Sequence, residues 1–378
     1  MGAVTLTDID RSHLRRALEL AEGGRGRVSP NPLVGAILAR DGEVIGEGFH
    51  AELGGLHAET AALAACRDAG TDPTGATLYV TLEPCAHHGR QPPCADAIVA
   101  AGISRVVIAS EDPTEKAAGR GPARLSDAGV DVAYSDGDEA IAARLLNQPF
   151  RKHARTGRPH VVLKSALTLD GRTASADGDS RWISSSASRE LVHRWRAEVD
   201  AVAVGVGTVL ADDPLLTARD LDPPPARQPL RVVFDSGARM PLGSKLVRSV
   251  GEAPLVVVVG AWAPSERTTA LADAGAEPIP VEGSGPERVA AALAELGRRG
   301  VTSLLLEGGA GLAGSFRDAG EIDELRLFIA PLVLGGAGAR ALIAGEGAAT
   351  IDEAERALAM EWERSGDDLL VRARLREW

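Results

Sequence analysis

The chain has 378 residues, 44% of them hydrophobic, and a formal net charge of −12. This length and apolar content predict a globular protein of two ordinary-sized domains and exclude a largely disordered chain. The acidic balance argues against a nucleic-acid-binding surface, which needs a basic patch. No apolar run approaches the roughly 18 to 20 residues of a membrane span, so we expect no membrane partner.

Three cysteines in so long a chain are too few for a secreted scaffold held together by disulfides. The N-terminal stretch "MGAVTLTDIDRSHLRRALELAEGG" lacks the apolar core of a signal peptide. We therefore expect a cytoplasmic protein with reduced thiols.

The segment "GGLHAETAALAAC" places His57 and Glu59 at the start of an Ala-rich helix. Residues two apart do not share a face of a regular helix. Both side chains can serve one site only if His57 lies at the very start of the helix, where the backbone still turns. Cys66, later in the same helix, is expected to be a small core side chain.

The stretch "TLEPCAHHGRQPPC" contains Cys85 and Cys94, each directly after a proline. His-x-Glu, then Pro-Cys, then a second Cys is the order found in zinc-dependent nucleobase deaminases, where the His and two thiolates hold Zn²⁺. Zinc with three protein ligands keeps a position open for water and lowers its pKa from about 15.7 to about 7. We predict zinc ligands His57, Cys85 and Cys94, with Glu59 as the catalytic acid and base.

Other interpretations of these residues stay open at this point. His87 or His88 could complete a closed structural zinc site, and the two cysteines could form a disulfide. Glu59 could be an ordinary carboxylate at a helix N-terminus.

Four motifs together resemble the deaminase half of the bifunctional riboflavin-biosynthesis deaminase/reductase family: "SPNPLVGAILARDGEVIGEGFH", "GGLHAE", "TLEPCAHHGRQPPC" and "AAGRGPARLSDAGV". The resemblance implies a cytidine-deaminase-like α/β sandwich and a diaminopyrimidinone substrate carrying a ribosylamino phosphate. It implies that Asn31 and His50 face the pyrimidine and that Arg90 is a candidate for the phosphate. Thr114 and Glu115 stand where the family usually has Asn-Pro.

The composition of the chain changes at "NQPFRKHARTGRPH", residues 147–160, which is rich in Arg, Lys and Pro and lacks apolar periodicity. We place the domain boundary there, giving a deaminase domain over residues 1–150 and a second domain over residues 151–378. Apolar β-rich runs alternate with helical segments after it, which predicts a second α/β domain.

The motif "GAGLAG", Gly309 to Gly314, follows an apolar run that ends at Leu306. Glycines at a helix N-terminus let backbone N–H groups approach a pyrophosphate. The late position of the motif argues against a Rossmann fold. A tight turn that needs positive φ is the alternative interpretation.

The motifs "KSALTLDGRTA", "SRWISS", "HRWRAEVDAVAVGVGTVLADDPLLTAR", "LLEGGAGLAGSF" and "APLVLGG" resemble the reductase half of the same family, whose fold is like dihydrofolate reductase and whose cofactor is NADPH. By this resemblance the cofactor would be lined by Ala166, Trp182, Thr208, Asp212, Ser236, Gly309, Ala310, Gly311, Leu312, Ala313, Gly314 and Ser315. The substrate would be faced by Ser180, Arg196, Leu216, Arg219 and Glu307.

Several of these side chains suggest specific roles. Arg196 and Arg219 could clamp the substrate phosphate, although a single arginine is often only solvated. Lys164 is a candidate to assist opening of the ribose. Asp235 would disfavour a cofactor 2′-phosphate, whereas Ser236 and Arg239 could bind one.

We predict a bifunctional enzyme that removes the pyrimidine amine by zinc-dependent hydrolysis and then reduces the ribosyl group to ribityl with NADPH. The alternative is a half-active or non-catalytic relative with a structural zinc domain. Exposed sheet edges lead us to expect a homo-oligomer.

Overall fold

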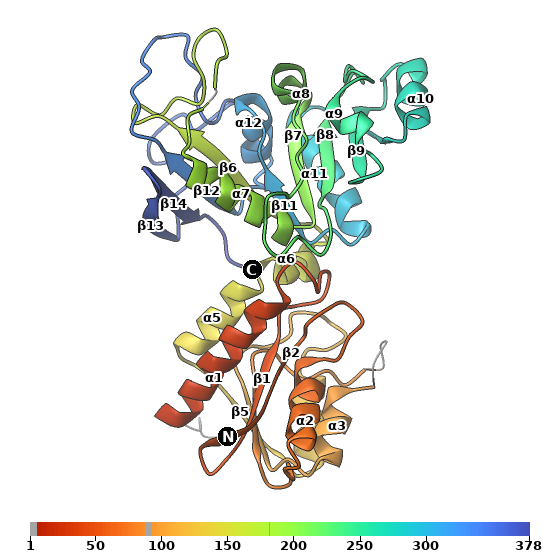
Figure 1. Cartoon of the computed structure of the whole chain (residues 1–378), viewed down its shortest axis with the longest axis vertical. Coiled ribbons are helices and arrows are strands. Elements are labelled where there is room, and N and C mark those ends of the chain that lie inside the picture. The colour runs from red at the N-terminus through yellow and green to blue at the C-terminus, as the bar shows by residue number, and fades with distance from the viewer. Residues whose placement is uncertain (1–5, 88–91, 181) are drawn as a thin grey trace. The chain divides into compact units, whose positions relative to one another are not determined.

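The computed structural model describes residues 6–87, 92–180 and 182–378, and it divides into two compact units (Figure 1). The division lies between Thr156 and Gly157, and the C-terminal Trp378 belongs to the first unit. The expected boundary at residue 150 falls inside helix α6 (Gln148–Thr156). The observed division still lies within residues 147–160, the segment in which the sequence placed the boundary, and Arg151 and Lys152 of this helix are buried.

The first unit is built around a five-stranded sheet. The second strand in its order is antiparallel to both neighbours, and the last three strands are parallel. Alternate residues of the strands are buried on opposite faces, as the period of two requires. In spatial order the strands are β2 (Glu43–Phe49), β1 (Gly35–Arg40), β3 (Thr77–Val80), β4 (Arg105–Ile108) and β5 (Asp131–Tyr134).

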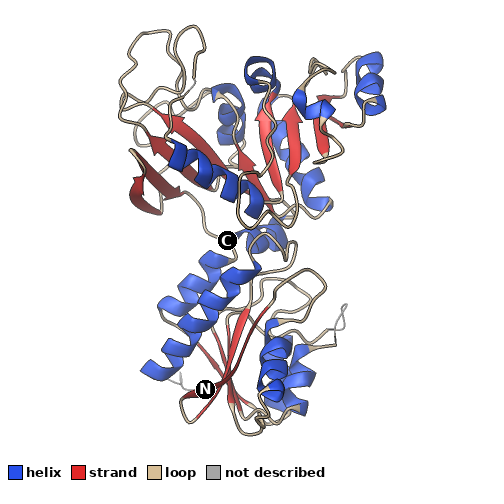
Figure 2. Ribbon diagram, in the orientation of Figure 1, coloured by secondary structure: helices blue, strands red, loops and turns tan. Residues whose placement is uncertain are grey.

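Helices cover both faces of this sheet, as Figure 2 shows. One face packs against α1 (Asp8–Ala21) and α5 (Asp138–Leu146), and a short 3-10 helix η1 (Glu22–Gly24) follows α1. The opposite face packs against α2 (Ala58–Asp68), α3 (Cys94–Ala100) and α4 (Arg120–Asp127). The unit is thus the α/β sandwich expected from the sequence.

The second unit contains a nine-stranded sheet. Its first seven strands are parallel, the eighth is antiparallel to the seventh, and the ninth is antiparallel to the eighth. Continuous apolar runs such as "LVVVVG" become fully buried strands because both faces of a parallel sheet are covered. The order is β10 (Glu277–Val281), β9 (Leu255–Gly260), β8 (Leu230–Phe234), β7 (Ala201–Gly205), β11 (Ser303–Leu306), β6 (His160–Leu167), β12 (Glu324–Ile329), β14 (Asp368–Arg374) and β13 (Ala359–Ser365).

Two helical layers enclose this second sheet. One layer holds α7 (Ser186–Glu198), α8 (Val206–Asp212), α9 (Lys245–Arg248) and α10 (Ser265–Asp273). The other holds α11 (Gly285–Arg298) and α12 (Ala310–Asp318). The carboxyl ends of the parallel strands meet at one edge, where ligands of such sheets bind. Within the described ranges, no helix has the length and apolar character needed to cross a membrane.

Candidate active sites

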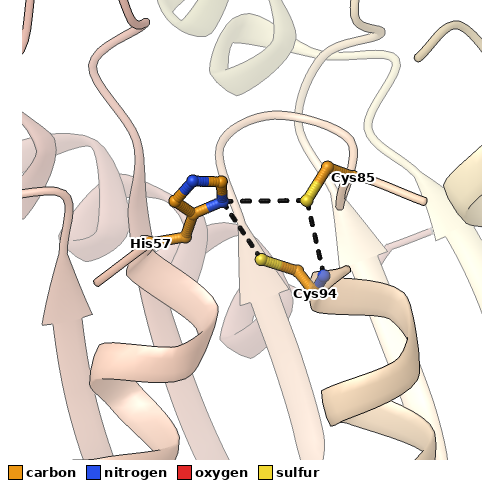
Figure 3. A group of neighbouring side chains, drawn as sticks. All are labelled: His57, Cys85 and Cys94. Carbon is orange, nitrogen blue, oxygen red and sulfur yellow. Dashed lines mark hydrogen bonds between the residues drawn. The ribbon is translucent and has the colours of Figure 1, made fainter. Parts of the chain in front are cut away.

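His57, Cys85 and Cys94 come together at one point of the first unit (Figure 3). His57 is the N-cap of α2 and has extended backbone angles, φ −72° and ψ 158°, which confirms its expected place at the very start of the helix. Its Nδ1 lies 3.7 Å from Cys85 Sγ and 3.3 Å from Cys94 Sγ. Tetrahedral zinc with ordinary Zn–N and Zn–S bonds would hold such atoms about 3.6 Å apart. The three donors therefore fit Zn²⁺.

The local structure favours the thiolate form of Cys85. Cys94 begins α3, and its backbone N–H lies 3.4 Å from Cys85 Sγ. The hydrogen bond from the Cys94 thiol, assisted by His57, lowers the pKa of Cys85 against the opposing effect of burial, and the same contact together with burial raises the pKa of Cys94. Both thiols are free, so the disulfide alternative does not hold. Cys66 is a buried core thiol, as expected, and lies close to Thr71 O.

Glu59 lies in the first turn of α2, with only 4% of the residue exposed. Burial raises the pKa of its carboxyl group to about 7. A carboxyl group with such a pKa can accept a proton and return it near neutral pH.

The metal cluster contains three ligands in the part of the chain that the structure describes. His87 is exposed and is not a member of it, and His88 lies outside the described residues. Three protein ligands leave a position for water, which is the arrangement of catalytic zinc sites.

Asn31 and His50 border this cluster. His50 Nδ1 lies 2.9 Å from Leu56 O, and its Nε2 lies 3.1 Å from Asn31 Nδ2. Because a carbonyl oxygen only accepts, Nδ1 carries the proton and Nε2 accepts from the Asn31 amide. Burial lowers the pKa of His50, which favours this neutral form. The rings of His50 and His57 meet edge to face with centroids 5.5 Å apart.

Two other expectations concern the loops of the first unit. Arg90 lies outside the described residues. Thr114 donates from its N–H and its hydroxyl to Asp112 Oδ1, at 2.8 and 2.7 Å. These hydrogen bonds within the turn stabilise it.

A cavity of about 1230 Å³ opens at the carboxyl ends of β6, β7, β8 and β11 in the second unit. It exceeds the volume of about 300–1,000 Å³ typical of small-molecule sites, so it has room for a dinucleotide beside a substrate. Most residues expected from the sequence line it, namely Lys164, Ala166, Ser180, Trp182, Arg196, Thr208, Asp212, Leu216, Arg219, Ser236, Glu307, Gly309, Ala310, Gly311, Leu312 and Ser315.

Two residues of the glycine motif do not line the cavity, which corrects the expectation for them. Ala313 is fully buried in the core, and a Cβ on Gly314 would lie 2.2 Å from Ala344 O. Gly314 is therefore needed for close packing. Gly309 is the N-cap of α12 with a φ of −72°, so the alternative of a turn with positive φ is wrong at this position.

A charged cluster lies in the cavity wall. Arg196 donates from Nε and Nη2 to the two carboxylate oxygens of Glu307, at 2.7 and 2.9 Å, and Lys164 Nζ lies 3.9 Å from the same carboxylate. Burial opposes ionisation of Glu307, but Arg196 outweighs it and lowers the pKa of Glu307 to about 2. Burial also lowers the pKa of Lys164.

This pairing changes the expected roles of the two arginines. The fork of Arg196 is occupied by Glu307, and its Nη1 donates to Thr217 O. Arg219 also lines the cavity, and its side chain is 46% exposed. Its Nε lies 3.6 Å from Asp220 Oδ2, so the ion pair of Arg219 is at the surface, whereas that of Arg196 is buried.

Trp182 is 70% exposed, so the alternative of a core tryptophan is wrong. The Arg189 guanidinium lies over its ring, 4.6 Å from the centroid. His193 and Arg288 also line the cavity, although sequence reasoning missed both. Arg288 contacts Ser236 across 52 positions, and no local motif marks such a contact.

The chain matches two family models. One describes the RibD C-terminal domain and matches residues 159–371, and the other describes the cytidine and deoxycytidylate deaminase zinc-binding region and matches residues 7–110. The chain is 39% identical to riboflavin biosynthesis protein RibD of Actinobacillus pleuropneumoniae, over 97% of this chain and 95% of that protein. It is 42% identical to the RibD protein of Escherichia coli, over 86% and 89% respectively.

Solved structures agree with these matches. Acinetobacter baumannii RibD superposes with a TM-score of 0.85 at 37% identity, covering 98% of this chain and 99% of that one. A diaminohydroxyphosphoribosylaminopyrimidine deaminase/5-amino-6-(5-phosphoribosylamino)uracil reductase from Thermotoga maritima gives 0.83 at 34% identity, covering 97% and 99%.

Proposed function

This chain belongs to the RibD family of riboflavin-biosynthesis proteins, and we propose that it acts on a diaminopyrimidinone carrying a ribosylamino phosphate, first removing ammonia and then reducing the ribosyl group to ribityl. It is a bifunctional enzyme with a zinc-binding deaminase domain followed by an NADPH-dependent reductase domain. One observation carries the proposal: a three-ligand metal cluster beside a buried glutamate and a cavity bordered by a glycine loop occur in the same chain.

In the deaminase domain, His57, Cys85 and Cys94 would hold the zinc ion, which lowers the pKa of a water molecule to about 7 when bound. Glu59 would take the proton of that water and deliver it to the ring nitrogen, then assist the departure of ammonia. Its raised pKa suits it to both steps. His50 and Asn31, beside the cluster, would orient the pyrimidine.

In the reductase domain, backbone N–H groups at the start of α12 would bind the cofactor pyrophosphate next to Gly309 and Gly311. Bound NADPH supplies the hydride. Arg219 would hold the substrate phosphate, and Arg196 would fix the position of Glu307. We assign to Lys164 the proton transfer that assists ribose opening, since its pKa is lowered by burial.

The remaining expected cavity residues would complete the two binding sites. For the cofactor these are Ala166, Trp182, Thr208, Asp212, Ser236, Ala310, Leu312 and Ser315, and for the substrate Ser180 and Leu216.

The test is a two-stage assay on the purified protein. The diaminopyrimidinone phosphate is added first without NADPH, while ammonia is measured, and NADPH is then added while its absorbance is followed. The proposal expects ammonia in the first stage and loss of NADPH in the second. Ammonia release without any NADPH oxidation would leave a deaminase alone, and the absence of both signals would contradict the proposal.

We also propose that the protein works as a homo-oligomer in the cytoplasm. Support for self-association comes from β13, the last strand of its sheet, where Met360 and Trp362 are 67% and 70% exposed. Such an edge strand is a template for pairing with another chain. Light scattering after size exclusion should give a multiple of the chain mass, reduced in Trp362→Glu; a monomeric unmutated protein would contradict the proposal.

A further inference from the structure

Arg288 lies on the first turn of α11 and reaches the residue that follows β8 and Asp235. Its Nη1 donates to the Ser236 hydroxyl, and its Nη2 donates to Gly283 O. Arg288 and Ser236 both line the reductase cavity. An arginine and a hydroxyl thus share one part of the cavity wall.

The surroundings of Arg288 differ from those of Arg196. In the described ranges no carboxylate lies within ion-pair distance of Arg288, whereas Arg196 is paired with Glu307. The Nε of Arg288 is buried and has no hydrogen-bond partner among the described residues. A guanidinium held in this way is suited to an anion that enters the cavity.

The neighbouring residues Asp235 and Arg239 are not among the residues that line the cavity. Asp235 is 1% exposed, and its Oδ2 accepts the Met240 N–H at 2.7 Å. Arg239 Nε lies 3.6 Å from Asp235 Oδ1, and the Arg239 side chain is 66% exposed. The carboxylate expected to repel a phosphate is therefore buried and hydrogen-bonded to the backbone outside the cavity lining, and Arg239 is not part of that lining either.

The distance of Ser236 from the glycine motif fits the adenosine end of a bound dinucleotide. β11 leads into the glycine motif, and the order β8, β7, β11 puts Ser236 two strands away from that motif. Two strand spacings are about 10 Å, a distance that the nucleoside arm of the cofactor can cover. A cofactor with its pyrophosphate at α12 would then carry its ribose towards Ser236 and Arg288.

We propose that Arg288, together with Ser236, binds the 2′-phosphate of NADPH and sets the preference of the reductase for NADPH over NADH. This inference rests on the proposed reductase site. The two cofactors differ only by that phosphate, which the guanidinium and the hydroxyl bind through charge-assisted hydrogen bonds.

The experiment measures dissociation constants for NADPH and for NADH without substrate, from the change in cofactor fluorescence. Arg288→Ala should weaken NADPH binding by at least about 10-fold, equivalent to about 1.4 kcal/mol, and change NADH binding by less than about two-fold. Arg288→Lys should retain more of the selectivity, because it keeps the charge. Thermal unfolding of each variant, followed by circular dichroism, reports whether the reductase domain is folded.

Arg239→Ala is the matched control, since it removes a nearby arginine outside the cavity, and it should leave both constants unchanged. Equal weakening of NADPH and NADH by Arg288→Ala would show a structural role and overturn the inference, as would selective loss of NADPH in Arg239→Ala. If the unmutated protein bound neither cofactor, the proposed reductase site itself would be wrong.

Discussion

Glu307→Gln should destabilise the reductase domain, because it leaves two cationic side chains without their counter-ion. Glu307, Arg196 and Lys164 are only 9%, 12% and 17% exposed. Removing one partner of a buried ion pair costs about 3–5 kcal/mol. We expect the lower end, about 3 kcal/mol, since these side chains line a cavity that water can enter. For a domain of this size the melting temperature should fall by about 6–12 °C.

The loss should depend on pH through Lys164. Burial already lowers the pKa of Lys164, and the charge of Glu307 partly restores it. Without Glu307 the folded-state pKa falls further below the unfolded value of about 10.4. The part of the penalty that comes from Lys164 is complete below the folded-state pKa and disappears as the pH rises from that pKa towards the unfolded-state pKa, whereas the part from Arg196 remains.

Thermal unfolding followed by circular dichroism at pH 7 and at pH 9 tests this reasoning. The difference in melting temperature between Glu307→Gln and the unmutated protein should be smaller at pH 9. Glu282→Gln, at an exposed position, is the control and should melt like the unmutated protein. A loss below about 1 kcal/mol, or the same loss at both pH values, would refute the proposed charge cluster.

Three further predictions concern metal and substrate. Cys85→Ala should reduce zinc from about one ion per chain to almost none by atomic spectroscopy, since a ligand is lost; retained zinc would contradict the metal site. Lys164→Ala should abolish reduction but retain NADPH binding, and unchanged reduction would remove Lys164 from the mechanism. Arg219→Ala should raise the KM of the reductase substrate about 10-fold with little change in NADPH affinity, because a phosphate contact is lost; an unchanged KM would assign the phosphate elsewhere.

The site in the first unit could be predicted from the sequence because its residues lie in short motifs with characteristic spacing. The requirement that His57 lie at the start of α2 followed from helix geometry alone, and the structure confirms it. In the second unit the glycine motif could be located from the sequence. Which of its residues line the cavity and which are buried in the core could not be predicted. That distinction depends on Ala344, whose backbone packs against Gly314.

Long-range polar contacts could not be predicted. Arg196 meets Glu307 across 111 positions, so no local motif indicates that the guanidinium of Arg196 is already paired. Helix α6 was missed because its buried side is polar: Arg151 donates to Trp378 O, and Lys152 lies over the Trp378 ring. A helix buried through such contacts has no apolar periodicity to detect.

The central claim is that one chain holds two independent active sites. The most direct test is the Glu59→Gln variant, assayed on the diaminopyrimidinone phosphate and on its deaminated product. The substitution keeps the size of the side chain but removes the proton shuttle. Ammonia release should fall by at least about 10²-fold, while NADPH oxidation with the deaminated product stays at the unmutated rate. Unchanged ammonia release, or loss of both activities in a folded protein, would contradict the account.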